Sequence, residues 1–322
     1  MALSQAKPVA RLRPPGLIGT LVGARSPLEI HQALWGYIFL LPWLLGLLIF
    51  TIGPILVSAY FSLMEYDVLS PPKFIGLENY VRAFTGDKQF WPSLWRTLDY
   101  SLQVVPLGII SSLLLAMLLN QGYKGTSFFR TMFFLPSLTP AVALALVWTW
   151  LLHPQLGPIN FALGWVGIQG PGWLADKLWA LRSLVLMALW AGVGGNQMLI
   201  FLAGLQGVPR ELLEAAEIDG AGPWARFRHV TIPMISPTLL FNLILGIIGA
   251  LKVFTLAFVA TNGGPSFSTW FYALHIYNQA FNYFRMGYAS ALSWLFLIII
   301  SVLTYIQFRV SGSWVFYSAE RQ

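Results

Sequence analysis

The 322-residue sequence contains no cysteine, and only 10% of its residues are charged. Without cysteine the chain forms neither a disulfide nor a thiolate metal site, and its redox compartment stays open. The phosphate-binding pattern GxxxxGK[ST] is also absent, so we expect any ATP hydrolysis to take place on another chain. Because the serines lack a nucleophile-elbow pattern as well, we predict no catalytic residue.

The few histidines do not indicate a metal site. His31, His153, His229 and His275 lie on different segments without the spacing of metal ligands, and surface or interfacial positions are the favoured interpretation for each. We therefore predict no metal ligand and no cofactor in this chain.

Apolar residues dominate the sequence. They make up 57% of the chain, and the mean hydropathy is +0.68, well above that of soluble proteins. Runs long enough to cross about 30 Å of hydrocarbon, which takes about 20 helical residues, occur at 34–63, 101–121, 131–152, 183–205, 236–260 and 286–308. Since a lone strand leaves its backbone groups unpaired in lipid, these runs predict an all-α integral membrane protein with six transmembrane helices.

Basic residues predict the orientation. Eleven of the 19 lysines and arginines flank one side of the six spans, seven flank the other, and Lys252 lies within the fifth span. The richer side holds both termini and the loop 207–233, so we expect these to be cytoplasmic. The net charge of +7 is spread over the flanks and does not form a stripe that binds nucleic acid.

The predicted organisation has four parts. Residues 1–33 form a basic cytoplasmic tail, 34–97 the first transmembrane helix with an external segment, 98–309 the core domain, and 310–322 a cytoplasmic C-terminal tail. A secretory signal at the N-terminus is disfavoured, because the apolar run is too long and no cleavage site bounds a short one. The segments 65–99 and 153–182, rich in Trp, Pro and Gly, predict short interfacial helices.

A polar island interrupts the apolar chain at 214–233, reading EAAEIDGAGPWARFRHVTIP. Pro209 suits a helix start and Gly220 a left-handed helix end, so we predict a short helix at 209–219. Gly222 and Pro223 permit a turn into a second short helix at 224–229, and Pro233 opens the next span. The island is therefore a helical elbow, with Leu212, Ala215, Ala216 and Asp219 on one face of its first helix.

This string closely resembles the EAA loop of the permease subunits of ABC importers. The matching positions are Glu214, Ala215, Ala216, Asp219, Gly220, Ala221 and Phe227. The resemblance implies that these residues form the surface that couples to an ATPase subunit. A plain solvated loop is the alternative, and the ordered run of matches favours the docking surface.

The resemblance extends along the chain. ATNGGPSFST at 260–269, HIYNQAF at 275–281, MGYASA at 286–291 and SGSWVFY at 311–317 are similar to sugar permeases of the maltose and glycerol-phosphate type. This similarity implies the type I ABC importer transmembrane fold in a bacterial or archaeal inner membrane. It also implies four partner chains: a second permease, two ATPase subunits that hold ATP and Mg, and an extracytoplasmic solute-binding protein. Import of a sugar by alternating access follows from the same likeness.

Polar residues inside the predicted spans are candidates for the substrate pathway. They are Trp190, Asn196, Gln197, Asn242 and Lys252, of which Lys252 is the one clear charge within a span. Buried amides also bond neighbouring helices, which is the plain alternative for the three amide side chains.

Glycines mark two further features of the spans. Gly192, Gly194 and Gly195 precede Asn196 and predict close packing or a local helix break, as in helices that line transport sites. In related permeases that bind sugar within the membrane, the helices beside the loop supply the contacts. At those positions this chain has Gly246, Gly249, Ala250 and Val253.

Two rival functions are weaker. A secondary transporter or channel normally carries carboxylates within its spans, whereas all twelve acidic residues lie outside the predicted ones. A permease for amino acids, peptides or phosphate esters would share the loop but not the TNGGP and MGYASA strings, and it is the runner-up.

Overall fold

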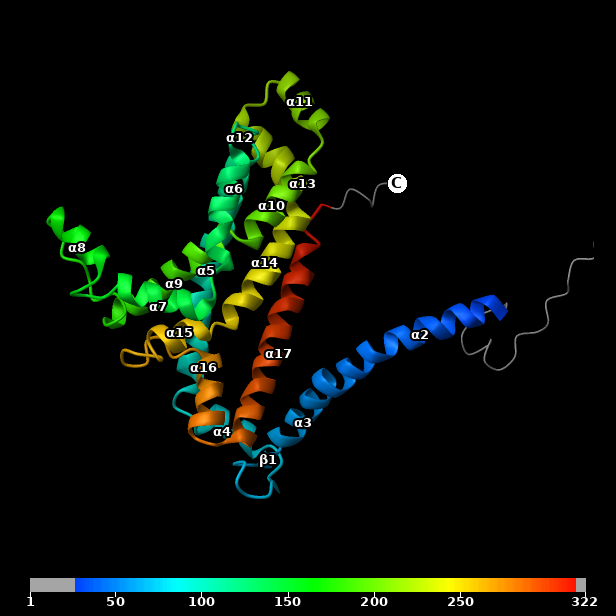
Figure 1. Ribbon diagram of the computed structural model, residues 1–322, viewed down its shortest axis with the longest axis vertical. Helices are drawn as coiled ribbons and strands as arrows, with labels where there is room; N and C mark the ends of the chain where they lie inside the picture. Colours follow the sequence, from blue (N-terminus) through cyan, green and yellow to red (C-terminus); the bar gives the residue numbers. More distant parts are fainter. Residues whose placement is uncertain (1–26, 317–322) are drawn as a thin grey trace, which may run out of the picture. The chain divides into compact units, whose positions relative to one another are not determined.

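The computed structural model describes residues 27–316, and the predicted tails therefore lie largely outside the described residues. Contacts divide the chain into two units, Met1–Tyr60 and Phe61–Gln322. The first unit consists of α2 (Pro27–Leu47), the π-helical turn η1 (Leu48–Ile52) and most of α3 (Gly53–Ser62) (Figure 1). His31–Ser62 is long and apolar enough to cross a membrane, in agreement with the first predicted span.

The second unit is a helical assembly around α5. Its elements in chain order are β1 (Met64–Glu65), β2 (Lys73–Phe74), α4 (Glu78–Thr85), α5 (Phe90–Leu119), α6 (Thr126–Phe134), η2 (Leu135–Leu138), α7 (Ala141–Leu151), α8 (Pro158–Trp165), α9 (Lys177–Gly192), α10 (Asn196–Gln206), α11 (Arg210–Ile218), α12 (Pro223–Arg226), η3 (Phe227–Thr231), α13 (Ile232–Met234), α14 (Ser236–Leu251), α15 (Thr255–Ala260), α16 (Tyr272–Tyr277), η4 (Asn278–Asn282) and α17 (Met286–Ser311). Among the described residues, β1 and β2 form a short antiparallel pair of strands, which the all-α prediction did not include.

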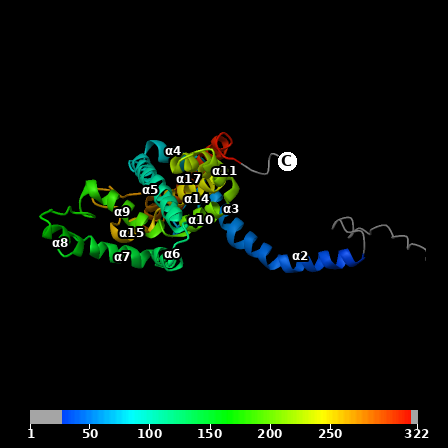
Figure 2. The ribbon, with the colours of Figure 1, turned by 90° about the horizontal axis from the view of Figure 1, so that it is seen from above.

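The six predicted spans have counterparts in the structure. Within the described residues, four helical stretches qualify as membrane spans by length and composition, and two bent helix pairs bring the number to six. In the second unit α5, α14 and α17 run side by side, with α10 also against α5 (Figures 1 and 2). The α5 helix begins at Phe90, earlier than the predicted 101, because the helix continues past the apolar run; Asp99 therefore lies inside a helix.

We predicted one continuous helix for the third span, at 131–152, and this prediction is wrong. The span bends by 94° between α6–η2 and α7. Pro136 lies in the 3₁₀ turn η2, and Thr139 is extended with ψ 129° because Pro140 follows it. The two prolines thus end the first half and redirect the chain into α7.

The fourth span breaks where the glycines predicted it. α9 and α10 meet at an angle of 49° across Val193–Gly195. A Cβ atom on Gly194 would collide with the backbone carbonyl of Phe133, so the break also brings the third and fourth spans into close contact. Ser112 of α5 donates a hydrogen bond of 2.9 Å to the Val193 carbonyl, which the break leaves free.

Packing, not removal of apolar surface from water, holds the spans together in lipid. Small residues lie at the contacts: Ala116 of α5 and Ala145 of α7 are fully buried. Larger side chains such as Met187 of α9 and Phe201 of α10 fill the space between them.

A buried polar cluster fastens the end of the second unit that carries β1, β2 and α4, which we call the hairpin end. Asp87 accepts hydrogen bonds from His275 Nε2 (2.8 Å) and from the Tyr288 hydroxyl (2.6 Å). Trp270 Nε1 donates to His275 Nδ1, so the ring proton lies on Nε2 and points to Asp87. The cluster joins the α4–α5 turn to α16 and α17.

Gly194→Ala should destabilise the assembled protein by about 1–3 kcal/mol, because the new methyl group forces the Phe133 backbone aside. Thermal unfolding of the purified complex measures the effect. Gly164→Ala is the control, since a Cβ on Gly164 meets nothing within 4 Å. Equal unfolding temperatures for the two variants would contradict the close contact.

Asp87→Asn should cost about 1–3 kcal/mol, because it leaves a buried donor without its carboxylate. Burial raises the pKa of Asp87, but the hydrogen bonds from His275 and Tyr288 lower it by a larger amount. The net result is a pKa below the ordinary value of 3.8. A carboxyl group whose pKa is lowered in the folded state stabilises the fold at pH values above its pKa in the unfolded chain. This stabilisation is lost as the pH falls. The penalty should thus be constant from about pH 5 to 8 and shrink below about pH 4, which unfolding at several pH values tests; a penalty that grows on acidification contradicts it.

Candidate coupling elbow and membrane cavity

The segment from α11 to α13, here called the elbow, lies at the end of the second unit opposite the hairpin end (Figure 1). Its first arm, α11, agrees with the predicted helix at 209–219 to within one residue, with Pro209 as N-cap. Gly220 has φ +79°, the predicted left-handed conformation. Gly220 N bonds to the Glu217 carbonyl and Ala221 N to the Ala216 carbonyl, the paired bonds of a Schellman cap.

The second arm is longer than predicted. Instead of a helix at 224–229, α12, the π-helical turn η3 and α13 continue without a gap from Pro223 to Met234. Pro233 does not open the next span but lies within α13, directly after the π-helical turn η3. The span itself, α14, begins at Ser236, whose hydroxyl accepts a hydrogen bond from Phe316 N.

An ion pair joins the two arms. Arg226 Nη1 lies 2.6 Å from Glu217 Oε2, and the Glu217 side chain is mostly exposed. An exposed pair of this kind contributes at most about 1 kcal/mol to stability. The pair therefore contributes little to the free energy of unfolding, and its main role is to hold the two arms next to each other.

The elbow presents one face to the bundle and one to its surroundings. Leu213 and Phe227 pack against the hydrophobic core. Among the predicted coupling residues, Glu214, Ala215, Asp219 and Gly220 are exposed, Ala216 and Ala221 are half-buried, and Phe227 faces inward.

Apolar side chains on the outer face were missed by the sequence analysis as contact residues. Ile218 is 86% exposed and Trp224 is 70% exposed. The signal was present, since both are large apolar residues inside a polar loop, and exposed apolar patches mark docking surfaces.

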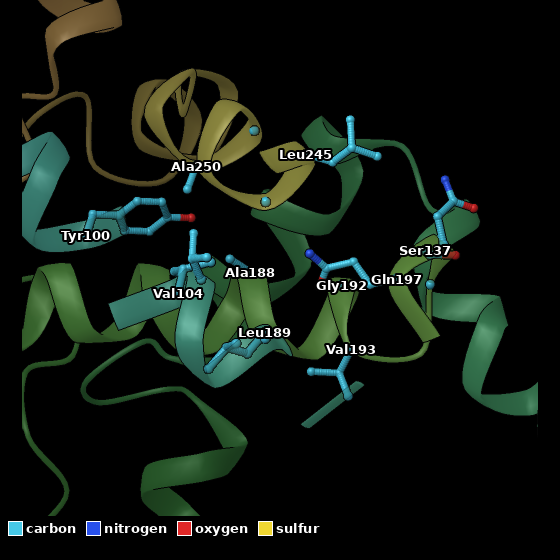
Figure 3. Close-up of a pocket in the computed structure, with 16 residues that line it drawn as sticks. Tyr100, Val104, Ser137, Ala188, Leu189, Gly192, Val193, Gln197, Leu245 and Ala250 are labelled. Carbon is cyan, nitrogen blue, oxygen red and sulfur yellow. The ribbon is translucent and has the colours of Figure 1, made fainter. Parts of the chain in front are cut away.

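A cavity of about 400 Å³ lies among α5, α9, α10 and α14, at the level of the helix break. Figure 3 shows Tyr100 and Gln197 entering it from opposite sides. The residues that line it are Tyr100, Val104, Val105, Gly108, Ser137, Ala188, Leu189, Gly192, Val193, Gly195, Asn196, Gln197, Leu245, Gly246, Gly249 and Ala250. Its volume is within the range of small-molecule sites.

Two glycines make room for Gln197. A Cβ on Gly108 would lie 3.5 Å from Gln197 Oε1, and a Cβ on Gly246 would lie 3.2 Å from Gln197 Nε2. The amide therefore projects between α5 and α14 into the cavity. None of the hydrogen bonds found among residues 27–316 uses this amide, so it is available to a ligand.

The polar groups of the cavity wall are uncharged. They are the hydroxyls of Tyr100 and Ser137 and the amides of Asn196 and Gln197. Tyr100 and Ser137 were not predicted, because only tertiary packing brings α5 and η2 to this level. Gly246, Gly249 and Ala250, the predicted counterparts of family sugar contacts, do line the cavity, and Val253 does not.

The other predicted pathway residues lie outside this cavity. Trp190 packs edge-on against Trp148, with ring centroids 5.7 Å apart. Asn242 is fully buried, and both atoms of its amide group lack a partner among the described residues. Lys252 is exposed in the turn between α14 and α15. A pathway role for these three stays a prediction.

The same two helices connect the elbow to the cavity. α10 begins at the cavity with Asn196 and Gln197 and ends just before α11. α14 begins just after α13 and reaches the cavity at Leu245 and Gly246. The elbow is therefore connected directly to two of the four helices around the cavity.

Residues 105–315 match the family of binding-protein-dependent transport system inner membrane components. This match spans the elbow and every residue that lines the cavity except Tyr100 and Val104. The chain belongs to this family and is a membrane-spanning permease subunit.

Individual relatives agree along nearly the whole chain. It is 41% identical over 291 residues to a probable ABC transporter permease protein, YesP, of Bacillus subtilis (strain 168), covering 89% of this chain and 93% of the relative. It is 34% identical to the trehalose/maltose transport system permease protein MalF of Thermococcus litoralis (strain ATCC 51850 / DSM 5473 / JCM 8560 / NS-C), covering 88% and 96%.

A solved structure shares the fold. A chain in the crystal structure of a bacterial ABC transporter involved in the import of the acidic polysaccharide alginate superposes with a TM-score of 0.78. The match has 24% identity and covers 89% of this chain and 98% of the other. The predicted type I ABC importer transmembrane fold is confirmed.

Gly220→Val should strain the elbow by about 1–3 kcal/mol, because a β-branched residue disfavours φ +79°. Since Gly220 lies at the far tip, we expect the spans to fold and the coupling of ATP hydrolysis to uptake to fail. Uptake and ATPase activity, measured on the same reconstituted preparation, test this.

Gly222→Val is the matched control for the elbow variant. Gly222 has φ −66° and open space around it, so valine fits there. Coupled transport at the unaltered rate in Gly220→Val would contradict the role assigned to the cap.

Proposed function

We propose that this chain is one of two homologous permeases in an ATP-driven importer of a sugar or sugar-like solute. Two ATPase subunits that carry ATP and Mg, together with an extracytoplasmic solute-binding protein, complete the assembly. The cavity among α5, α9, α10 and α14 is this chain's part of the translocation pathway.

The uncharged polar lining of the cavity carries the sugar assignment. A neutral sugar presents many hydroxyls, which hydroxyl and amide side chains bind as both donors and acceptors. An amino acid or phosphate ester carries charge, and binding it in a low-dielectric site calls for a countercharge. The name of the trehalose/maltose relative favours the same substrate class.

The outer face of the elbow is the proposed ATPase contact. Ala215 and Ala216 allow close approach of another backbone, Glu214 and Asp219 flank them, and Trp224 offers an exposed aromatic anchor. In this arrangement the elbow and both termini face the cytoplasm, as the basic residues predict.

Alternating access follows from the shared helices. ATP-driven closure of the ATPase pair displaces the elbow, and α10 and α14 carry the displacement to the cavity. Such coupling works only through contacts that differ between the inward and outward states. The 49° break before α10 lies at the cavity, where the displacement arrives.

Gly249→Trp should abolish uptake while leaving assembly intact. Gly249 lines the cavity, and a Cβ there meets nothing within 4 Å, so the indole occupies open space instead of the packed core. Uptake of labelled sugar and subunit stoichiometry are the measurements.

Gly164→Trp in α8 is the control for added bulk, because Gly164 also has open space around it and lies outside the cavity. Normal uptake by Gly249→Trp would show that substrate does not pass through the cavity.

A further inference from the structure

The junction between the elbow and α14 is a weak point in the helical backbone. α13 ends at Met234 and α14 begins at Ser236, and between them Ile235 departs from the helical conformation with φ −90° and ψ 4°. Pro233 and Pro237 lie on either side of this residue. Because proline has no N–H, two bonds of the helical ladder are missing around Ile235, and helices bend most easily at such interruptions.

Ser236 supplies the bond that Pro237 cannot make. In a continuous α-helix the N–H of residue 237 donates to the carbonyl of residue 233. Here the Ser236 hydroxyl donates to the Pro233 carbonyl at 2.6 Å. Ser236 is 1% exposed, so this bond lies away from solvent, where a hydrogen bond is electrostatically stronger. The last turn of the elbow is therefore tied to the first residue of α14.

The same hydroxyl also holds the segment that follows α17. Its oxygen accepts a hydrogen bond of 2.8 Å from Phe316 N, 80 residues further along the chain. After Ser311 the chain turns back, with Trp314 N and Val315 N both bonded to the Ser311 carbonyl, and this turn brings Phe316 to α14. Figure 1 shows the end of α17 close to α13 and to the start of α14.

This arrangement differs from an ordinary helix cap. A serine at a helix start usually accepts a hydrogen bond from the N–H groups of its own first turn. The Ser236 oxygen accepts from Phe316 N instead, and its hydroxyl hydrogen goes to the Pro233 carbonyl. One buried side chain thus joins the elbow, α14 and the segment after α17.

α17 gives this contact a firm support. The polar cluster around Asp87 holds its start, and Gly287 N donates a hydrogen bond of 3.0 Å to the Tyr66 carbonyl. Further along, the Tyr272 hydroxyl donates to the Leu292 carbonyl at 3.0 Å. Because α17 is one helix from the hairpin end to the turn that precedes Phe316, the contact with Ser236 is anchored to the opposite end of the unit.

We infer that Ser236 is a positioning residue for coupling, which makes the elbow and α14 move as one body braced by the segment after α17. The inference rests on the function proposed above. With the hydroxyl in place, displacement of the elbow moves α14 and with it Gly249 in the cavity wall. Without the hydroxyl, the junction bends at Ile235, and the elbow moves while α14 stays behind.

The test uses the complete transporter in lipid vesicles, with Gly249→Cys as the parent and a membrane-impermeant maleimide as the probe. The measured quantity is the labelling rate with ATP and vanadate relative to the rate without them, so no transported solute is needed. Ser236→Ala should reduce this nucleotide response about fivefold, the factor that one buried hydrogen bond contributes to an equilibrium. The ATPase subunits should stay bound, since the outer face of the elbow is unchanged.

Phe316→Pro breaks the same contact from the other side. It removes the N–H that donates to Ser236 and leaves the hydroxyl in place, so the nucleotide response should again fall. Phe316→Ala is the matched control, because it keeps the N–H. Ser293→Ala is the control for a lost serine hydroxyl, which there bonds to the Ala289 carbonyl within α17. Both controls should respond like the parent.

The double variant shows whether the two residues act through one contact. Ser236→Ala with Phe316→Pro should respond like Ser236→Ala alone, because the bond that proline removes is already absent. Two unrelated structural defects would instead give losses that multiply.

Three results would overturn the inference. A full nucleotide response in Ser236→Ala or in Phe316→Pro, with a responding parent, would overturn it and leave the proposed function standing. Losses that multiply in the double variant would assign the two residues to separate effects. A parent that shows no nucleotide response would overturn the coupling in the proposed function, and this inference with it.

Discussion

The contact between Gly194 and the carbonyl of Phe133 is the constraint on which the membrane region depends. It tolerates no side chain, and it joins the broken fourth span to the bent third span. Because both spans deviate at this level, Ser137, Asn196 and Gln197 reach a common space and are not buried against each other. A close backbone contact thus creates a polar cavity inside an apolar assembly.

The elbow is connected to the helix break and to the cavity through two helices. α10 leads from the break to α11, and α14 returns from α13 to the cavity. Near the elbow the two helices touch, since a Cβ on Gly204 would lie 2.7 Å from Thr238 Oγ1. The Schellman cap at Gly220 and the Arg226–Glu217 pair fix the arms relative to each other. In the proposed mechanism, force on the elbow reaches the cavity through these two packed helices, and the helix break lies at the far end of α10.

Much of this architecture was readable from local sequence. Apolar runs located the spans, and the glycines at 192, 194 and 195 located the break. Gly220 gave the left-handed cap. The 94° bend at Pro136 and Pro140 also had a local signal, which a simple hydropathy run conceals. Tyr100 in the cavity wall had no such signal: it belongs to a segment assigned outside the second span, and only the packing of α5 brings it opposite Gln197. Lys252 shows a second limit of the sequence analysis. Its position within an apolar run does not decide whether its side chain faces a cavity.

The central claim is that movement of the elbow changes the cavity through α10 and α14. The chain has no cysteine, so Gly249→Cys places a single thiol in this chain, on the cavity wall. The direct measurement is its labelling rate by a membrane-impermeant thiol reagent in the assembled transporter, with and without ATP and vanadate. The account predicts a rate that changes with nucleotide, and a change that disappears when Ala216→Trp blocks the elbow contact. A nucleotide-dependent rate that persists in the blocked elbow, with ATPase subunits still bound, would contradict it.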